Sequence, residues 1–252
     1  MTVLESIFLG LLQGFTEFLP VSSSGHLMLA QKLFDIDAGL FFDVMLHLGT
    51  LVAVVIAMRK SLWQTIRHPI ADKRFLYLTL ASIPTFAIAL LVKLFVSEQL
   101  MQKLLPVGFA ATIVLIVLSD KLSKPKARLC ETNVLPPIVT GIVQGIAVFP
   151  GLSRSGATIS SMKLFGVNPS DSAEFSFLLS IPVILASAAV EIWEVAQTTV
   201  STPWYTLAAG VVAAFLSGLV SVKVVMRAVK HNRWIWFALY LAVPLILSLI
   251  TL

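Results

Sequence analysis

The sequence predicts an all-α polytopic membrane protein with six transmembrane helices and two re-entrant helix–loop–helix hairpins, arranged as an inverted-topology repeat. Three observations predict it: long apolar runs, Lys and Arg confined to alternate loops, and one segment that occurs twice. Of the 252 residues, 58% are hydrophobic and 12% are charged, and the mean hydropathy is +0.94. A soluble domain carries about 25% charged residues, so an ordinary soluble protein is excluded.

A helix that crosses a bilayer needs about 20 mostly apolar residues. The segment at 106–119 is short, and we expect it to extend into its flanks. The first residues, Met1–Ser6, contain Glu5 and no basic region, so they are not expected to form a signal peptide. The single cysteine, Cys130, cannot form an internal disulfide. The six predicted spans are Leu40–Met58, Phe75–Val96, Pro106–Ser119, Phe175–Ile192, Tyr205–Val222 and Trp234–Leu252.

The basic residues set the expected orientation in the membrane. Of the 18 Lys and Arg residues, 13 lie in three stretches, 59–74, 120–136 and 223–233. The two alternate stretches, 97–105 and 193–204, hold one between them. Cytoplasmic loops are rich in Lys and Arg, so the three basic stretches are expected in the cytoplasm and both termini in the periplasm. All five Trp residues lie near predicted span ends, as in an aromatic belt.

An internal repeat divides the chain into 1–130 and 131–252, within one membrane domain. The segment GLLQGFTEFLPVSSSGHLMLAQKLFDID at 10–37 aligns without a gap with GIVQGIAVFPGLSRSGATISSMKLFGVN at 141–168, at an offset of 131. Ten of the 28 aligned positions are identical, which indicates duplication. Each repeat has one unusual segment and three spans. Because three is odd, the second repeat is expected to enter the membrane upside down.

The unusual segments are too short to cross the membrane. In the first repeat, Ser6–Leu19 and His26–Phe34 flank the loop PVSSSG, and in the second, Pro137–Phe149 and Ala157–Phe165 flank PGLSRSG. Irregular backbone at membrane depth is tolerated only inside protein or beside a wet cavity. Interrupted segments at matching places in two repeats indicate a binding site, so the two loops are expected to meet near the middle of the membrane.

Both loops are expected to bind an anion. Each precedes a helix, whose first-turn N–H groups attract phosphate, and each holds two serines and a glycine in Ser-x-Ser-Gly order. Helix capping by serine is the simpler interpretation, but two copies at membrane depth favour a ligand with more than one phosphate. The predicted substrate-binding residues of the loops are Ser22, Ser24, Gly25, Ser153, Ser155 and Gly156.

The two repeats differ where chemistry is expected. Intramembrane ionisable residues are costly and are usually functional. Ser23 with His26, three residues further along, resembles a nucleophile with its base. Arg154 offers a planar fork for phosphate oxygens. The unequal pairs at the offset of 131 are Glu17 with Val148, Ser23 with Arg154, and His26 with Ala157.

A divalent cation is expected at Gln13 and Glu17, which are four residues apart on one helix face. Their oxygens suit Mg²⁺ or Ca²⁺, with substrate phosphates and water completing the shell. The alternative is that Glu17 accepts backbone N–H groups at the end of its short helix.

The remaining ionisable residues are expected to be structural. Asp43 and His47 lie in the first span, and Asp43 matches Glu174 in the second repeat. This match favours a symmetric packing or capping role, with support of the site as the alternative. His68 and His231 lie in basic stretches and are expected to be solvated.

Four segments resemble the undecaprenyl-diphosphate phosphatase family, also called the bacitracin-resistance family. They are QGFTEFLPVSSSGH (13–26), FDVMLHLGT (42–50), PGLSRSGAT (150–158) and SAEFSFLLSIP (172–182). The similarity in length, order and spacing covers essentially the whole chain.

The resemblance implies an enzyme of the bacterial inner membrane that hydrolyses undecaprenyl diphosphate and so recycles the lipid carrier of peptidoglycan synthesis. It implies a divalent cation and a site open to the periplasm. The family's serine and histidine correspond to Ser23 and His26, and its acidic motif to Gln13 and Glu17, with Gln in place of one carboxylate. Its arginine motif corresponds to Ser153, Arg154 and Thr158.

Several alternatives stay open at this stage. Water activated by His26, or a phosphohistidine, would replace attack by Ser23. A polyprenyl-phosphate flippase would use the same inverted repeat and anion site without a nucleophile, and a purely structural subunit would not need Glu17 or Arg154. The expected partners are the polyprenyl diphosphate and membrane lipids, with a homodimer left open and nucleic acid not expected.

Overall fold

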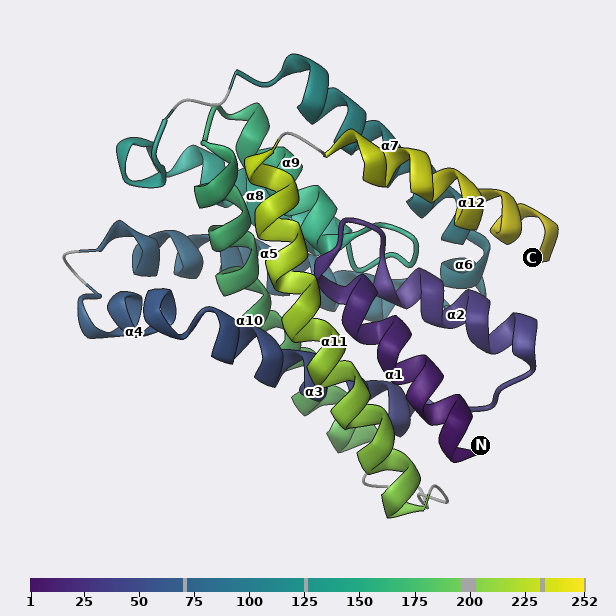
Figure 1. The fold of residues 1–252 in the computed structure, drawn as a ribbon. Helices are drawn as coiled ribbons and strands as arrows, with labels where there is room; N and C mark the ends of the chain where they lie inside the picture. Colours follow the sequence, from purple (N-terminus) through teal and green to yellow (C-terminus); the bar gives the residue numbers. More distant parts are fainter. Residues whose placement is uncertain (70–71, 125–126, 196–202, 232–233, 252) are drawn as a thin grey trace.

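The computed structural model describes residues 1–69, 72–124, 127–195, 203–231 and 234–251, and these form helices joined by short connections (Figure 1). Five helices are long and apolar enough to cross a membrane, as the hydropathy predicts. They are α3 (Leu40–Ala57), α5 (Lys73–Phe95), α7 (Leu105–Leu122), α10 (Pro169–Val195) and α11 (Trp204–Lys230). The prediction of a multi-pass, all-helical membrane protein is therefore confirmed.

The sixth predicted span is α12 (Ile235–Thr251), a shorter apolar helix of 17 residues. At 1.5 Å per residue it is about 25 Å long. The short segment predicted at 106–119 extends at both ends, as expected, to form the 18 residues of α7.

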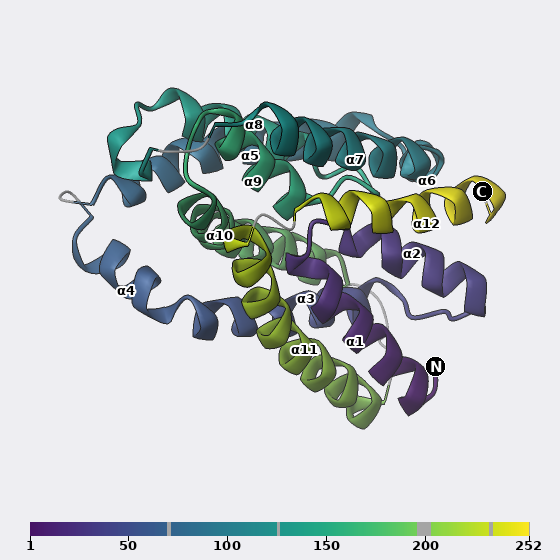
Figure 2. The same cartoon turned by 45° about the horizontal axis from the view of Figure 1, so that its top comes forward.

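Two pairs of short helices form the predicted hairpins. α1 (Val3–Phe18) is followed by α2 (Ser23–Phe34), and α8 (Leu135–Ile146) by α9 (Arg154–Leu164). The longest of the four has 16 residues and rises about 24 Å, less than the ~30 Å hydrocarbon thickness of a bilayer. Figures 1 and 2 show α2 returning beside α1 toward the end of the molecule that holds both termini.

Each hairpin packs against the other half of the chain. α1 lies along α11, and α8 lies along α5. The aligned glycines Gly10 and Gly141 make this close approach possible, because a Cβ on either would overlap a backbone carbonyl, of Gly210 and Ala81 respectively. Small residues at such contacts are typical of helix packing in membranes.

Hydroxyl groups bond across these same contacts. Thr85 of α5 donates to the carbonyl of Gly141 at 2.8 Å, and Ser221 of α11 donates to the carbonyl of Phe15 at 2.8 Å. The long helices α3 and α10 also pack together, as do α7 and α12. In both pairs the second helix is the counterpart of the first at the offset of 131.

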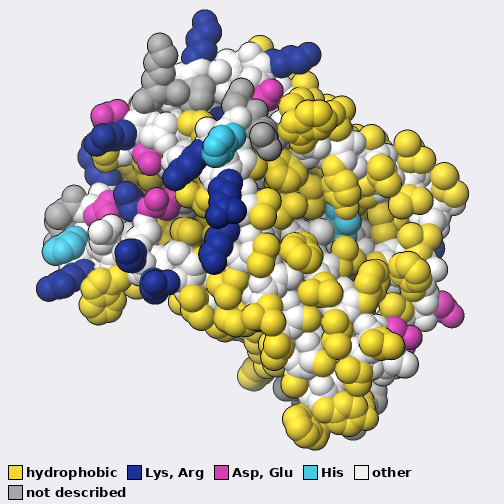
Figure 3. Space-filling model, viewed as in Figure 1, with side chains coloured by type: hydrophobic (Ala, Val, Ile, Leu, Met, Phe, Trp, Pro, Cys, Tyr) yellow, Lys and Arg dark blue, Asp and Glu magenta, His cyan; other side chains and the backbone are white. Residues whose placement is uncertain are grey.

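The surface divides into an apolar part and a basic end. Figure 3 shows Lys and Arg gathered over one end of the visible face, with Asp and Glu among them, and mainly hydrophobic side chains over the rest. This basic end lies near α4 (Arg59–Arg67), and both termini lie at the opposite end (Figures 1 and 2). Exposed apolar side chains over several helices are what a lipid-facing surface requires.

All three predicted basic loops are partly helical. The stretch 59–74 contains the whole of α4, and the stretch 223–233 continues α11 as far as Lys230. The stretch 120–136 holds the end of α7, the 3₁₀ turn η1 (Leu129–Glu131) and the start of α8, and α6 (Glu98–Lys103) lies between α5 and α7. Among the expected features, Lys126, Arg233, Leu252 and residues 196–202 lie outside the described residues.

Four of the five tryptophans are exposed, as the expected aromatic belt requires, and the fifth is buried. Trp63, Trp193, Trp204 and Trp236 are exposed, whereas Trp234 is 1% exposed. Its ring packs edge-on against Phe237, its indole N–H donates to Ser160 at 3.4 Å, and the Lys163 ammonium lies 5.6 Å from its centroid. The contacts of its ring and its N–H make Trp234 part of the core.

Candidate active site

The first loop turns the chain from α1 to α2 at residues 19–22. Ser22 adopts a φ of 68°, which is uncommon outside glycine, and its hydroxyl caps α2 by accepting the Gly25 N–H at 3.4 Å. A side chain on Gly25 would overlap Phe109 and crowd Gly151 of the second loop. The turn therefore places Ser23 at the start of α2, with the two loops in direct contact.

The second loop is anchored on both sides. Ser153 caps α9 by accepting the Gly156 N–H at 3.1 Å, and its own N–H donates to Thr112 of α7 at 2.9 Å. Ser155 donates its hydroxyl proton to the carbonyl of Leu19 in the first loop at 2.9 Å. The N-termini of α2 and α9 are thus brought together, as the sequence predicts, and both loop serines Ser22 and Ser153 also cap helices.

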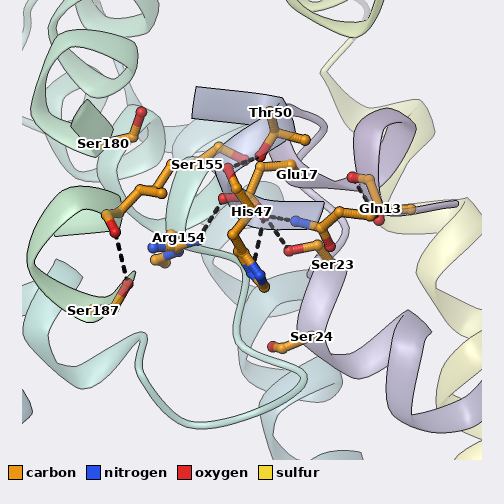
Figure 4. Close-up of polar contacts among 12 residues, drawn as sticks. Gln13, Glu17, Ser23, Ser24, His47, Thr50, Arg154, Ser155, Ser180 and Ser187 are labelled. Carbon is orange, nitrogen blue, oxygen red and sulfur yellow. Dashed lines mark hydrogen bonds and ion pairs between the residues drawn. The ribbon is translucent and has the colours of Figure 1, made fainter. Parts of the chain in front are cut away.

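Polar side chains from four helices converge on the carboxylate of Glu17 (Figure 4). Its Oε1 accepts a charged hydrogen bond from Arg154 of α9. Its Oε2 accepts from the Ser23 hydroxyl at 2.5 Å and from Gln13 Nε2 at 3.0 Å. His47 of α3 places Nε2 3.8 Å from the same Oε2.

The Glu17 side chain is only 3% exposed and that of Arg154 is 24% exposed. A buried carboxylate is tolerated when a cation and hydrogen-bond donors compensate it, and here Arg154, Ser23 and Gln13 do so. The carboxylate that accepts the Ser23 proton is also in position to remove it. The structure therefore brings together four predicted residues, Gln13, Glu17, Ser23 and Arg154, in one connected group.

His26 is not part of that group. Its Nδ1 lies 2.8 Å from the carbonyl of Ser22, and its Nε2 lies 2.9 Å from the Tyr240 hydroxyl on α12. The two rings stack at 5.7 Å with 7° between their planes. Both ring nitrogens are thus occupied, and the expected hydrogen bond between Ser23 and His26 is not formed. Helical side chains lean back toward the preceding turn, which here carries the ring to Ser22.

Comparison with known proteins assigns the chain to a family. The model of the bacitracin resistance protein BacA family matches residues 6–246. This chain belongs to the BacA family. Among its relatives, the undecaprenyl-diphosphatase of Syntrophotalea carbinolica is 38% identical over 95% of this chain and 95% of that protein. Undecaprenyl-diphosphatases of Carboxydothermus hydrogenoformans (36% identity, 95% and 94% covered) and Methanosphaera stadtmanae (34%, 98% and 97%) are similar.

The remaining predicted substrate-binding residues of this BacA protein lie further from Glu17 or face other partners. Thr158 is fully buried and donates to the Arg154 carbonyl at 2.9 Å, with the Ser176 hydroxyl 2.6 Å away. Ser24 is exposed beside the capping hydroxyl of Ser22, at 3.5 Å. Thr158 is thus placed to hold the first turn of α9, while Ser24 is free to meet a ligand.

Asp43 and Glu174 both have the expected helix-packing role, but the expected symmetry of their contacts is wrong. Asp43 accepts two contacts from Gln31 Nε2, at 2.9 and 3.1 Å, which tie α3 to α2. Glu174 on α10 instead accepts from Arg74 at 2.6 Å and from Ser61, near the basic end. The aligned carboxylates are both bonded, but they join different elements of the BacA fold.

Two residues beside the site, His47 and Tyr240, were not predicted from the sequence to belong to it. His47 carried a signal, because an ionisable side chain inside a predicted span is costly. Tyr240 carried no such signal: it is 214 positions from His26, in a span with no motif.

A cavity of about 540 Å³ lies away from these residues, near the basic end. It is lined by Gln64, His68, Asp72, Lys73 and Cys130.

Proposed function

We propose that this chain hydrolyses the terminal phosphate of undecaprenyl diphosphate, which releases phosphate and returns undecaprenyl phosphate to the carrier cycle of peptidoglycan synthesis. The observation that carries the proposal is the Ser23–Glu17–Arg154 group at the N-termini of α2 and α9. The relatives named as undecaprenyl-diphosphatases support the choice of substrate.

The diphosphate would bind where the two hairpin loops meet. First-turn N–H groups of α2 and α9 would attract an anion at this junction. Ser24 adds an exposed hydroxyl. Arg154, a quarter exposed, would exchange its contact with Glu17 for the terminal phosphate. This exchange would release Glu17 from the Arg154 guanidinium when the phosphate arrives.

The Ser23 hydroxyl would then attack the terminal phosphorus in line. The new bond joins Ser23 Oγ to phosphorus, the bond from phosphorus to the bridging oxygen breaks, and undecaprenyl phosphate leaves. Glu17 takes the Ser23 proton, and Arg154 neutralises charge on the transferred group. Water then cleaves the phosphoserine, so that inorganic phosphate leaves and Ser23 is restored.

The alternatives at the nucleophile are less well supported by the contacts. A phosphohistidine at His26, or water activated by it, requires a free ring nitrogen. Both nitrogens of His26 already have partners, on Ser22 and Tyr240. The Ser23 hydroxyl, by contrast, already points at a carboxylate that can accept its proton.

The residues present fit a divalent cation, as the family resemblance implies. The Gln13 Oε1 atom is buried and has no hydrogen-bond partner, and the side-chain amide lies against Glu17. Among the described residues no group of three His, Cys, Asp or Glu side chains suits a metal, so substrate and water oxygens would complete the shell. Gln13 and Glu17 would hold the ion, whose chemistry is to neutralise the diphosphate and polarise its terminal phosphoryl group.

A lipid-phosphate flippase is the rival function, and the evidence weighs against it. The relatives are named as phosphatases. A flippase has no use for a serine whose proton is bonded to a buried carboxylate.

We also propose that the protein lies in the bacterial inner membrane as an inverted repeat, with the site open to the periplasm. The basic end at α4 would then be cytoplasmic. A homodimer stays a prediction. Impermeant thiol labelling of single-cysteine variants in a Cys130→Ser background tests the orientation. We expect position 67 to be protected in intact cells, and labelling there would contradict the model.

The function itself is tested with purified protein and undecaprenyl diphosphate in detergent. We expect stoichiometric release of phosphate and formation of undecaprenyl phosphate. Transport of the intact lipid between leaflets of a vesicle, without phosphate release, would favour the flippase.

A further inference from the structure

We infer that His47 is a third protein ligand of the divalent cation, and that the site therefore favours a transition metal such as Mn²⁺ over Mg²⁺. The inference rests on the proposed function only for the presence of a cation beside Glu17. It is carried by three observations on the contacts of His47, Glu17 and Gln13.

The first observation is the separation between His47 and Glu17. Nε2 and Oε2 are 3.8 Å apart, which is too long for a hydrogen bond between them, since such charged bonds are about 2.7–2.9 Å. Two ligands that each bind one ion at about 2.1 Å lie at most about 4.2 Å apart. The gap therefore fits an ion that touches both atoms better than it fits a direct contact.

The second observation is the hydrogen bond on the other ring nitrogen. His47 Nδ1 lies 2.8 Å from the backbone carbonyl of Asp43. A carbonyl only accepts, so Nδ1 carries the proton and Nε2 presents its lone pair to Glu17 in the neutral ring. Histidines that bind metals are typically held in this way, with the second N–H on a carbonyl or carboxylate.

The Asp43 end of α3 is itself held in place, because the Asp43 carboxylate accepts from Gln31. The His47 side chain is 22% exposed, so it is not sealed inside the protein.

The third observation is the unpaired amide oxygen of Gln13. Oε1 is buried without a partner while Nε2 faces Glu17 Oε2 at 3.0 Å. Rotation of the amide by half a turn would bring Oε1 toward Glu17, an arrangement of two acceptors that only a cation stabilises. Arg154 bonds the other carboxylate oxygen, and the proposed ion would share Oε2 with the Ser23 hydroxyl.

The resulting donor set is one carboxylate oxygen, one amide oxygen and one imidazole nitrogen. Imidazole is a ligand of first-row transition metals, whereas Mg²⁺ and Ca²⁺ prefer oxygen ligands. Substitution of a group that supports or binds a metal typically lowers affinity 10–100-fold. We expect His47→Gln to lower Mn²⁺ affinity by about that factor and to change Mg²⁺ affinity much less.

The test is electron spin-echo envelope modulation of Mn²⁺ bound to tag-free, full-length protein. A ¹⁴N coupling reports imidazole nitrogen bound directly to the ion. Histidines 68 and 231 are changed to Gln in every sample to remove surface sites. The samples compared are this parent, His47→Gln and, as the matched control, His26→Gln, with circular dichroism to confirm folding.

We expect the ¹⁴N coupling in the parent and in His26→Gln, and its loss in His47→Gln. A parent without the coupling, or a coupling that survives in His47→Gln, would overturn the inference. Phosphate release is measured separately on the same samples. A parent that releases phosphate without the coupling would sink this inference alone, whereas coupling without phosphate release would sink the proposed function and leave the metal site standing.

Discussion

The two hairpins, α1–α2 and α8–α9, share a scaffold and differ in how they use their polar groups. In the second hairpin the hydroxyls serve packing: Ser155 bonds the first loop and Thr158 bonds Ser176. In the first hairpin, Ser23 bonds a carboxylate and Ser24 is exposed. The second hairpin adds one charged group, Arg154, to the first hairpin's site.

The comparison teaches that shared glycines and serines build the meeting point, while the unequal residues supply the chemistry. The aligned glutamines make the same point. Gln13 lies against Glu17, whereas the counterpart of Glu17 beside Gln144 is Val148. If the first hairpin reacts and the second supports it, substitutions at aligned positions will have unequal effects.

The largest difference is expected at Ser23. Ser23→Ala should lower phosphate release by at least about 10³-fold, because loss of a nucleophile removes the covalent route. Binding of the lipid diphosphate should survive, since Arg154 and the helix N-termini remain. The matched control is Ser155→Ala in the second hairpin, which should retain most activity. Phosphate release and lipid binding are measured for both variants. Equal losses of phosphate release would contradict the claim that the first hairpin reacts and the second supports it.

A smaller loss is expected when Arg154 is changed to Lys. The guanidinium fork can bind phosphate through two N–H groups, and an ammonium cannot. Removal of one such charge-stabilising donor costs on the order of 10²–10³ in rate. The control is Lys163→Arg on the same helix, which tests whether α9 tolerates the exchange. Near-normal kcat in Arg154→Lys would show that a point charge is sufficient.

A contrast of about 10-fold is expected between the two glutamines. Gln13→Met should weaken Mn²⁺ binding by about 10-fold or more, because it removes an oxygen ligand. Gln144→Met should leave metal binding unchanged and stabilise the protein by about 1 kcal/mol, because Gln144 Nε2 is buried without a partner. Metal titration and thermal unfolding measure both effects. Equal metal affinities in the two variants would show that Gln13 does not bind the ion.

The smallest effect is expected at Tyr240. Tyr240→Phe removes the hydrogen bond to His26 but keeps the stacked ring. A typical net hydrogen bond is worth about 1 kcal/mol, so a loss of roughly 5-fold in kcat/KM is the upper range. Tyr205→Phe, on an exposed ring of α11, is the control. A loss of activity as large as that of Ser23→Ala would show that His26 takes a direct part in the reaction.

Much of this architecture could be predicted because apolar length and glycine spacing are local properties of the chain. The spans and the hairpins follow from runs and repeats, and the repeat also predicts that the two loops meet, but it does not predict the bond between Glu17 and Arg154. Contacts between distant segments could not be predicted. Nothing in the sequence shows that His47 would reach Glu17 or that Trp234 would be buried against Lys163.

The missing contact between Ser23 and His26 has a similar cause. Spacing of three residues indicates a shared helix face, but it does not tell which way a ring turns or that α12 supplies Tyr240 as a partner. The equal treatment of Asp43 and Glu174 was wrong because duplication preserves residue types without preserving neighbours.

The central claim is that Ser23 attacks phosphorus and forms a covalent intermediate. The most direct test is the stereochemical course of hydrolysis at a terminal thiophosphate made chiral with oxygen isotopes. Two successive in-line displacements, first by Ser23 and then by water, predict net retention of configuration at phosphorus. Inversion would show a single displacement by water and would contradict the account.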